Sequence, residues 1–265
     1  MVEKPWGRDR LPAPFIAPPG QRIGEVWFEP PAALPGLLVK YIFTGEKLSV
    51  QVHPSDAQTM ALGLGRQGKA VCWLVIAADP GAVLGIGVGN EHDPEALRAA
   101  ALDGSIEHLL TWYPVQSGDF FVIPPGTVHA IGAGVSLIEV QQNSDITYRL
   151  FDYGRPRQLH LDAGIAVAQG KPHDPALRRQ LAPAGSVSLV DGPLFRLDRL
   201  DRAPDPATVA RYGEAPVLVI PMHGEVEVGG ETVRPGQCAL ARVLQAVKLP
   251  PGALALIAQD CAQPA

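Results

Sequence analysis

Three side chains suited to metal binding lie in two short segments of the sequence. Gln51 and His53 stand two residues apart in LSVQVH (48–53), and His129 comes three residues after the PPG turn at 124–126. Imidazole nitrogens are common ligands of zinc, and an amide oxygen can also coordinate a divalent ion. The combination predicts one metal ion held by Gln51, His53 and His129.

The elements around His129 favour a fixed orientation. The run FFVI (120–123) predicts a strand that ends at the PPG turn, and a second strand is expected over 135–141 after the glycine-rich turn at 132–134. A lone histidine beside a strand is more often structural than a ligand. The sequence of turn, strand and turn reverses that preference, because it holds the side chain in one direction.

The segment 48–53 is expected to be a strand that ends at Pro54. Alternate residues of a strand face opposite sides of its sheet. One face would carry Leu48, Val50 and Val52, and the other Ser49, Gln51 and His53. A polar face of this kind is either solvent-exposed or the wall of a polar site, and His129 on another strand favours the site.

Lys40 lies in the middle of the apolar run LLVKYIF (37–43), which predicts a buried strand. Lysine is almost never buried without a partner. The side chain would therefore either reach solvent from the edge of a sheet or point into a pocket that binds an anion.

Composition and charge limit the class of protein. The formal net charge of the 265 residues is −5 and no basic run occurs, so neither nucleic acid nor an anionic membrane is an expected partner. No apolar stretch approaches the ~18 residues of a membrane span, and residues 1–7 hold no apolar signal segment. Cys72, Cys238 and Cys261 lack a metal-like spacing. A cytoplasmic protein with reduced thiols is expected.

The pattern of short apolar runs and scattered turns predicts an all-β chain with few helices. Residues 1–20 are expected to form an extended arm, and Asp93-Pro94 predicts the start of a helix that ends at Gly104. The predicted domains are 1–168, which would bind the metal, and 185–265, with a linker at 169–184.

Several segments together resemble the type I mannose-6-phosphate isomerases of the cupin superfamily, in their short bacterial branch. The segments that carry this resemblance are KPWG (4–7), LLVK (37–40), LSVQVHP (48–54), GDFFVIPPGTVHAIG (118–132), EVQQNSDITYRLFDYGR (139–155) and LHL (159–161). The resemblance covers residues 4–168. It implies a cupin barrel of antiparallel strands followed by a smaller, degenerate cupin-like β-domain without metal.

The resemblance also implies a ligand set for one zinc ion. Gln51, His53 and His129 match three ligands of the family, whereas Val71 stands where the family has a glutamate. The loss of that carboxylate predicts weaker zinc binding, because the remaining donors are neutral. Glu139 or Glu46 would be the nearest substitutes.

The resemblance implies roles for five more residues. Arg149 matches the catalytic arginine of the family, Glu139 and Asp145 match acidic pocket residues, and Lys40 and Lys69 match pocket lysines that bind phosphate or substrate oxygens. We therefore expect Arg149, Glu139, Asp145 and Lys40 to be catalytic, and Lys69, Lys40 and Arg149 to bind the substrate. The residues themselves leave another interpretation, an ion-pair cluster of Arg149, Asp145 and Asp152 at the end of a strand.

The function that this resemblance implies is a zinc-dependent aldose–ketose isomerase that interconverts mannose 6-phosphate and fructose 6-phosphate. Its partner would be a small-molecule sugar phosphate, and the chain would be a monomer or homodimer. The alternative is a cupin that binds a sugar phosphate without turnover, because Val71 removes a ligand. A third hypothesis, an iron-dependent cupin oxygenase, is weakened because such sites usually combine two histidines with a carboxylate.

Overall fold

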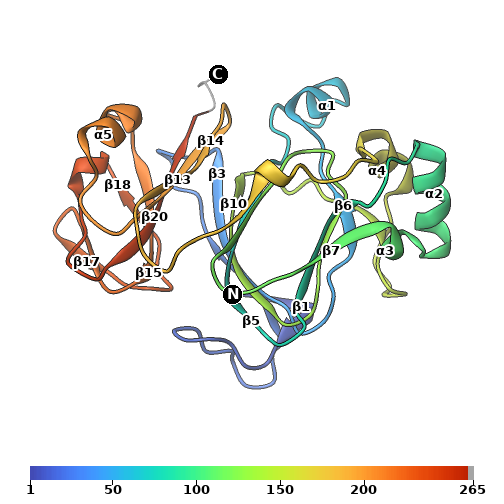
Figure 1. Ribbon diagram of the computed structural model, residues 1–265, viewed down its shortest axis with the longest axis horizontal. Coiled ribbons are helices and arrows are strands. Elements are labelled where there is room, and N and C mark those ends of the chain that lie inside the picture. The colour runs from blue at the N-terminus through green and yellow to red at the C-terminus, as the bar shows by residue number, and fades with distance from the viewer. Residues whose placement is uncertain (262–265) are drawn as a thin grey trace. The chain divides into compact units, whose positions relative to one another are not determined.

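The computed structural model describes residues 1–261, which divide into two units (Figure 1). Unit 1 comprises Met1–Arg10, Ala17–Trp27 and Val39–Gln180. Unit 2 comprises Leu11–Ile16, Phe28–Leu38 and the described residues from Leu181 onward. Two N-terminal segments belong to unit 2, so the units are not consecutive in the sequence. The domain boundaries predicted at 168 and 185 remain a proposal.

A seven-stranded sheet forms one wall of unit 1. In spatial order its strands are β1 (Val2–Arg8), β2 (Ile23–Phe28), β3 (Leu37–Phe43), β10 (Val135–Gln142), β5 (Val71–Ala78), β8 (Asp119–Ile123) and β12 (Arg178–Gln180). The strand β3 is therefore internal, between β2 and β10, which excludes the sheet-edge interpretation of Lys40.

A five-stranded sheet forms the other wall. Its order is β11 (Tyr148–Phe151), β4 (Val50–Val52), β9 (His129–Ile131), β6 (Val83–Val88) and β7 (Leu110–Pro114). Trp73, Ile123 and Leu137 of the first sheet share one apolar cluster with Leu84 and Ile131 of the second. Two antiparallel sheets enclosing one core form a barrel, which confirms the expected all-β cupin fold.

Helices cover the outer face of the five-stranded sheet (Figure 1). They are α2 (Pro94–Asp103), α3 (Ile106–Leu109) and α4 (Leu161–Val167). Helix α1 (Asp56–Ala61) follows β4, and the 3₁₀ turn η1 (Pro175–Leu177) precedes β12. Val50 and Val52 of β4 pack in a cluster with Ala101 of α2 and Val167 of α4. Because the valines point outward, Gln51 between them points into the barrel.

The structure corrects the expectations for Leu48 and for residues 2–8, and confirms the helix after Asp93. Leu48 belongs to the inner cluster and not with Val50 and Val52, because regular strand structure starts only at Val50. Residues 2–8 form strand β1, paired with β2, and not a free arm. The helix predicted after Asp93 is confirmed, with Asp93 accepting from the backbone N–H of Ala96.

Unit 2 is built from two further sheets. One has the order β13 (Val187–Asp191), β14 (Phe195–Leu200), β20 (Leu254–Asp260), β15 (Val217–His223) and β18 (Ala239–Ala241), and the other β17 (Glu231–Val233), β16 (Val226–Val228) and β19 (Val247–Lys248). Helix α5 (Pro206–Tyr212) and the 3₁₀ turn η2 (Leu244–Ala246) complete it. Valines and leucines of both sheets share one core.

No helix among residues 1–261 is both long enough and apolar enough to span a membrane.

Candidate active site

Three of the expected site residues lie in a row across the five-stranded sheet. Gln51 of β4 is the direct register partner of His129 on β9 and of Arg149 on β11. Side chains of direct partners lie on the same face of a sheet. The register therefore places Gln51, His129 and Arg149 side by side on the inner face of the barrel.

His53 and His129 are close enough to share a ligand. Their ring centroids are 4.9 Å apart. Each Nδ1 lies against a backbone oxygen, at 2.9 Å from Ile146 for His53 and 2.8 Å from Thr127 for His129. A carbonyl oxygen can only accept, so each Nδ1 carries the proton and each Nε2 keeps its lone pair.

Burial keeps both imidazoles neutral. Loss of hydration lowers the pKa of His129 to about 4 and that of His53 well below its ordinary value, with Lys69 lowering the His53 pKa further. Neutral imidazole is the form that binds a metal ion.

A backbone hydrogen bond joins the two histidine segments. The N–H of Gly126 donates to the carbonyl oxygen of His53 over 2.8 Å. Gly126 has φ of +84°, a conformation that residues with a Cβ rarely adopt. The turn before His129 is thereby fixed to the end of the strand that carries Gln51.

The Gln51 amide contacts His129 on the neighbouring strand and Ser49 in its own segment. Its Nε2 lies 3.3 Å from Nε2 of His129, and its Oε1 accepts from the Ser49 hydroxyl over 3.3 Å. A half-turn of the amide about its last side-chain bond exchanges its nitrogen and oxygen. The oxygen would then face the same space as the Nε2 lone pair of His129, where a metal ion could bind both.

The opposite wall contributes a second polar row. Glu139 of β10 is the register partner of Trp73 on β5, and the indole N–H of Trp73 donates to Glu139 over 2.8 Å. Lys40 of β3 places Nζ 3.7 Å from Oε1 of Glu139. The Trp73 ring also meets the His129 ring edge-on, with centroids 5.4 Å apart, so the two rows touch.

Two lysines and a carboxylate set the charge of the interior. Burial alone would raise the pKa of Glu139, but Lys40, Lys69 and the Trp73 indole lower it, so the carboxylate is ionised. Burial lowers the pKa of Lys69 to about 8, although Glu139 opposes this shift. A larger fraction of Lys69 is therefore neutral near pH 7–8 than of an ordinary lysine, whose pKa is about 10.4.

Val71 lies in the inner apolar cluster with Trp73 and Ile123 and is 1% exposed. It shares the inner face of β5 with Trp73, two residues further along. A carboxylate at this position would enter the barrel, whereas valine adds only apolar surface.

Neither expected substitute carboxylate is free. Glu139 is engaged by Lys40 and Trp73, and Glu46 pairs on the surface with Arg22 and Arg155. Among residues 1–261, no group of three or more His, Cys, Asp or Glu side chains is placed to hold a metal ion.

The donors still fit a divalent metal held by neutral groups. The two Nε2 lone pairs and the Gln51 amide oxygen would give three protein donors, as in zinc sites that keep one position open. Nδ1 of His53 and of His129 already donates to a backbone carbonyl oxygen, a bond that orients metal-binding imidazoles.

A cavity of about 540 Å³ collects these residues. Its lining includes Lys40, Gln51, Lys69, Glu139, Asp145 and Arg149. His53 and His129 are buried beside it, at 3% and 1% exposure. The interpretation of Arg149 as part of an ion-pair cluster is not supported, because Arg149 forms no ion pair with the described residues.

Ser49, expected on the same face as Gln51, also lines the cavity. Other lining residues were not expected from the sequence, and they are Lys4, Trp6, Glu25, Trp27, Ile42, Leu48, Ile131, Thr147, Arg157, Gln158 and His160. The Trp27 indole N–H donates to Glu25 over 2.7 Å, and Lys40 lies 4.4 Å from the centre of the Trp27 ring. The two-residue spacing of Glu25 and Trp27 in the segment GEVWFE (24–29) was the available signal, whereas Arg157 follows an irregular loop.

Searches of known proteins identify similar chains. No protein-family model matches. The chain is 38% identical over 207 residues to "Mannose-6-phosphate isomerase" of Streptococcus mutans, covering 74% of this chain and 64% of that protein. It is 42% identical over 139 residues to "Mannose-6-phosphate isomerase ManA" of Bacillus subtilis, covering 50% and 44%. The matched region thus spans less than two thirds of either relative.

Solved structures share the fold. The crystal structure of the mannose 6-phosphate isomerase from Bacillus subtilis superposes with a TM-score of 0.74 at 22% identity, covering 97% of this chain and 96% of that one. A putative mannosephosphate isomerase from Archaeoglobus fulgidus gives a TM-score of 0.71 at 22% identity, covering 97% and 94%.

Proposed function

We propose that this chain, a homologue of proteins named mannose-6-phosphate isomerase, interconverts mannose 6-phosphate and fructose 6-phosphate with one bound zinc ion. The observation that carries the proposal is one cavity lined by a buried Lys–Glu pair and an arginine without an ion pair among the described residues, with a neutral histidine pair buried beside it. Each group serves a different requirement of the reaction.

Aldose–ketose isomerisation moves a proton between C2 and C1 of the open-chain sugar through an enediol. The base must be partly deprotonated at the working pH. Lys69, with a pKa of about 8, meets this condition, whereas an exposed lysine does not. We therefore extend the expected binding role of Lys69 to proton transfer.

The second requirement is control of charge on the sugar oxygens. Lys40 and Glu139 form a donor and an acceptor fixed to each other and to Trp73, and they can hold neighbouring hydroxyl groups. Asp145 on the cavity lining would accept from a further hydroxyl. When bound by Gln51, His53 and His129, zinc would supply a Lewis acid for the carbonyl oxygen.

The third requirement is recognition of the phosphate. Arg149 has one side-chain hydrogen bond, from Nη1 to the carbonyl oxygen of Gln158 over 3.0 Å. Its Nε and Nη2 are left for an anion, and arginine binds phosphate in a bidentate manner.

Unit 2 is proposed to be structural. His223 lies exposed at the end of β15, and Glu225 pairs with Arg234. A sugar phosphate in the cytoplasm as the partner, and a monomer or homodimer as the assembly, remain our expectations.

Binding of a sugar phosphate without turnover is the alternative that Val71 leaves open. The relatives favour the isomerase, since each is named for that activity. The test is metal analysis of the purified protein together with a coupled assay for fructose 6-phosphate, before and after treatment with a chelator. Zinc content near one per chain, and activity that zinc restores, are expected. Tight sugar-phosphate binding without activity in excess zinc would favour the alternative.

A further inference from the structure

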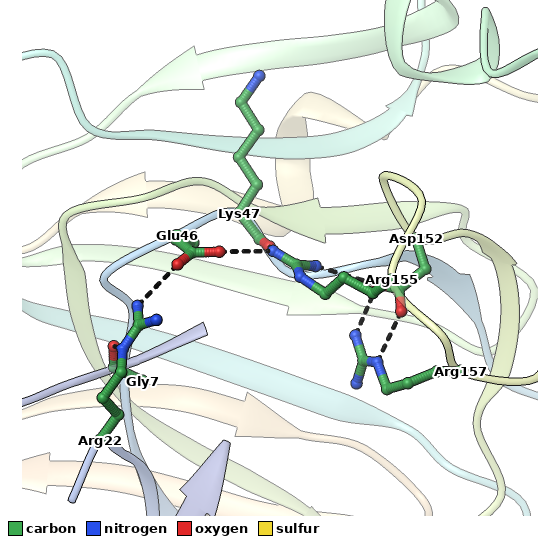
Figure 2. Close-up of polar contacts among 7 residues, drawn as sticks. All are labelled: Gly7, Arg22, Glu46, Lys47, Asp152, Arg155 and Arg157. Atoms are coloured by element: carbon green, nitrogen blue, oxygen red, sulfur yellow. Dashed lines mark hydrogen bonds and ion pairs between the residues drawn. The ribbon is translucent and has the colours of Figure 1, made fainter. Parts of the chain in front are cut away.

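Asp152 holds Arg157 at two points. Nε of Arg157 lies 2.6 Å from Oδ2 of Asp152, and Nη2 lies 2.6 Å from Oδ1, as Figure 2 shows. The Asp152 side chain is 2% exposed, and that of Arg157 is 27% exposed. A bidentate pair on a buried carboxylate fixes the plane of the guanidinium group.

This arrangement leaves part of Arg157 available. Asp152 takes Nε and Nη2, and Nη1 has no hydrogen-bond partner among residues 1–261. Arg157 lines the same cavity as Arg149, Gln158 and His160.

The two arginines are close enough to affect each other electrostatically. Burial lowers the pKa of Arg149, and the charge of Arg157 lowers it further. Two guanidinium groups directed at one cavity repel each other unless an anion lies between them. Their unused N–H groups, on Arg149 and Arg157, would each donate to such an anion.

An ion-pair network holds Asp152 in place. Arg155 also donates to Asp152, over 3.0 Å, and pairs with Glu46, which in turn pairs with Arg22 (Figure 2). The network contains three guanidinium groups and two carboxylates, so one positive charge is uncompensated. Asp152 therefore orients Arg157 without neutralising the region.

We infer that Arg157 binds the phosphate group of the substrate together with Arg149, and that Asp152 is the positioning residue for Arg157. The inference rests on the proposed function for the identity of the substrate. The phosphate would lie at the Arg149–Arg157 end of the cavity, and the reacting carbons would extend toward His53 and His129.

The experiment measures binding of inorganic phosphate by calorimetry at low ionic strength. We expect Arg157→Gln to weaken binding about tenfold or more, and Arg157→Lys less, because lysine keeps the charge and loses the fork. Asp152→Asn should weaken binding roughly three- to tenfold, because it releases Arg157 from its fixed plane.

Arg211→Gln is the matched control. Arg211 pairs with Asp198, and the exposed fractions of these side chains, 23% and 2%, resemble those of Arg157 and Asp152, but neither lines the cavity. The control should bind phosphate within about twofold of wild type while losing a comparable ion pair. Melting curves identify any variant that fails to fold. If Arg157→Gln does not fold, the phosphate affinity of Arg157→Lys tests the role of Arg157 instead.

Steady-state kinetics with mannose 6-phosphate distinguish a loss of positioning by Asp152 from a general loss of activity. Asp152→Asn should raise KM while kcat changes less than about threefold, since a remote anchor acts mainly on binding. Wild type that does not bind phosphate, or folded Arg157→Gln that binds it like wild type, would overturn the inference. Unchanged phosphate affinity in Asp152→Asn would overturn the positioning role. Phosphate binding through Arg157 without any isomerisation would refute the proposed function alone.

Discussion

Lys40 and Glu139 form an ion pair inside the barrel, with 3.7 Å between Nζ and Oε1 and side-chain exposures of 5% and 7%. Each charge is compensated by the other, because burial keeps water from solvating either side chain. Glu139 is further held by the Trp73 indole, whose ring meets His129. The pair is thus connected through Trp73 to the ring of His129.

Removing the cation should destabilise the fold. Lys40→Met leaves Glu139 buried without its partner, which costs about 3–5 kcal/mol when a buried pair is broken. Urea denaturation with the double variant Lys40→Met/Glu139→Gln as control measures the effect. The double variant should recover part of the loss, and equal stability of Lys40→Met and wild type would show that the pair does not matter.

A carboxylate at position 71 should strengthen metal binding. Val71→Glu would place a negative charge on the inner face of β5, where Val71 is 1% exposed. Without metal the buried carboxylate costs several kcal/mol, so the apo variant should melt earlier than wild type. Its melting temperature should rise more than that of wild type on adding zinc.

Val71→Gln is the control for this change, since it has the shape of glutamate without the charge. Zinc titration of the three proteins in one buffer gives the comparison. Zinc affinity of Val71→Glu no higher than that of Val71→Gln would mean that position 71 does not reach the metal.

Arg149 should matter for turnover more than for folding. Its side chain makes one hydrogen bond, to Gln158, and no ion pair with the residues that the structure describes. Arg149→Ala should keep stability within ~1–2 kcal/mol of wild type. It should reduce kcat/KM at least about a hundredfold, or 2.7 kcal/mol of barrier. Normal activity with this substitution would remove Arg149 from the mechanism.

The pH dependence should reflect Lys69. A base must be neutral, and burial places the pKa of Lys69 at about 8. The value of kcat/KM should therefore rise with pH up to about 8 and then level off. Lys69→Met should abolish this limb. A decline of kcat/KM as pH rises through 8 would instead indicate that Lys69 acts as a cation.

Patterns within single strands predicted part of the site. Gln51 and His53 share a face because of their two-residue spacing, and the turn before His129 restricts its direction. The structure brings these residues together. Their roles as metal ligands remain a prediction.

Pairing between distant segments could not be predicted in the same way. The contact of Glu139 with Trp73 depends on the register of β10 and β5, and that of Lys40 depends on β3 being internal. The Asp152–Arg157 pair depends on the path of an irregular loop. Residue spacing along the chain carries no information on strand register or on the path of a loop, because both are set by packing in three dimensions.

The most direct test is to incubate the zinc-loaded protein with mannose 6-phosphate and follow both hexose phosphates by NMR. We predict that fructose 6-phosphate appears and that the same final mixture is reached from either sugar. A mannose 6-phosphate spectrum that stays unchanged, with a protein shown to be folded and to contain zinc, would contradict it.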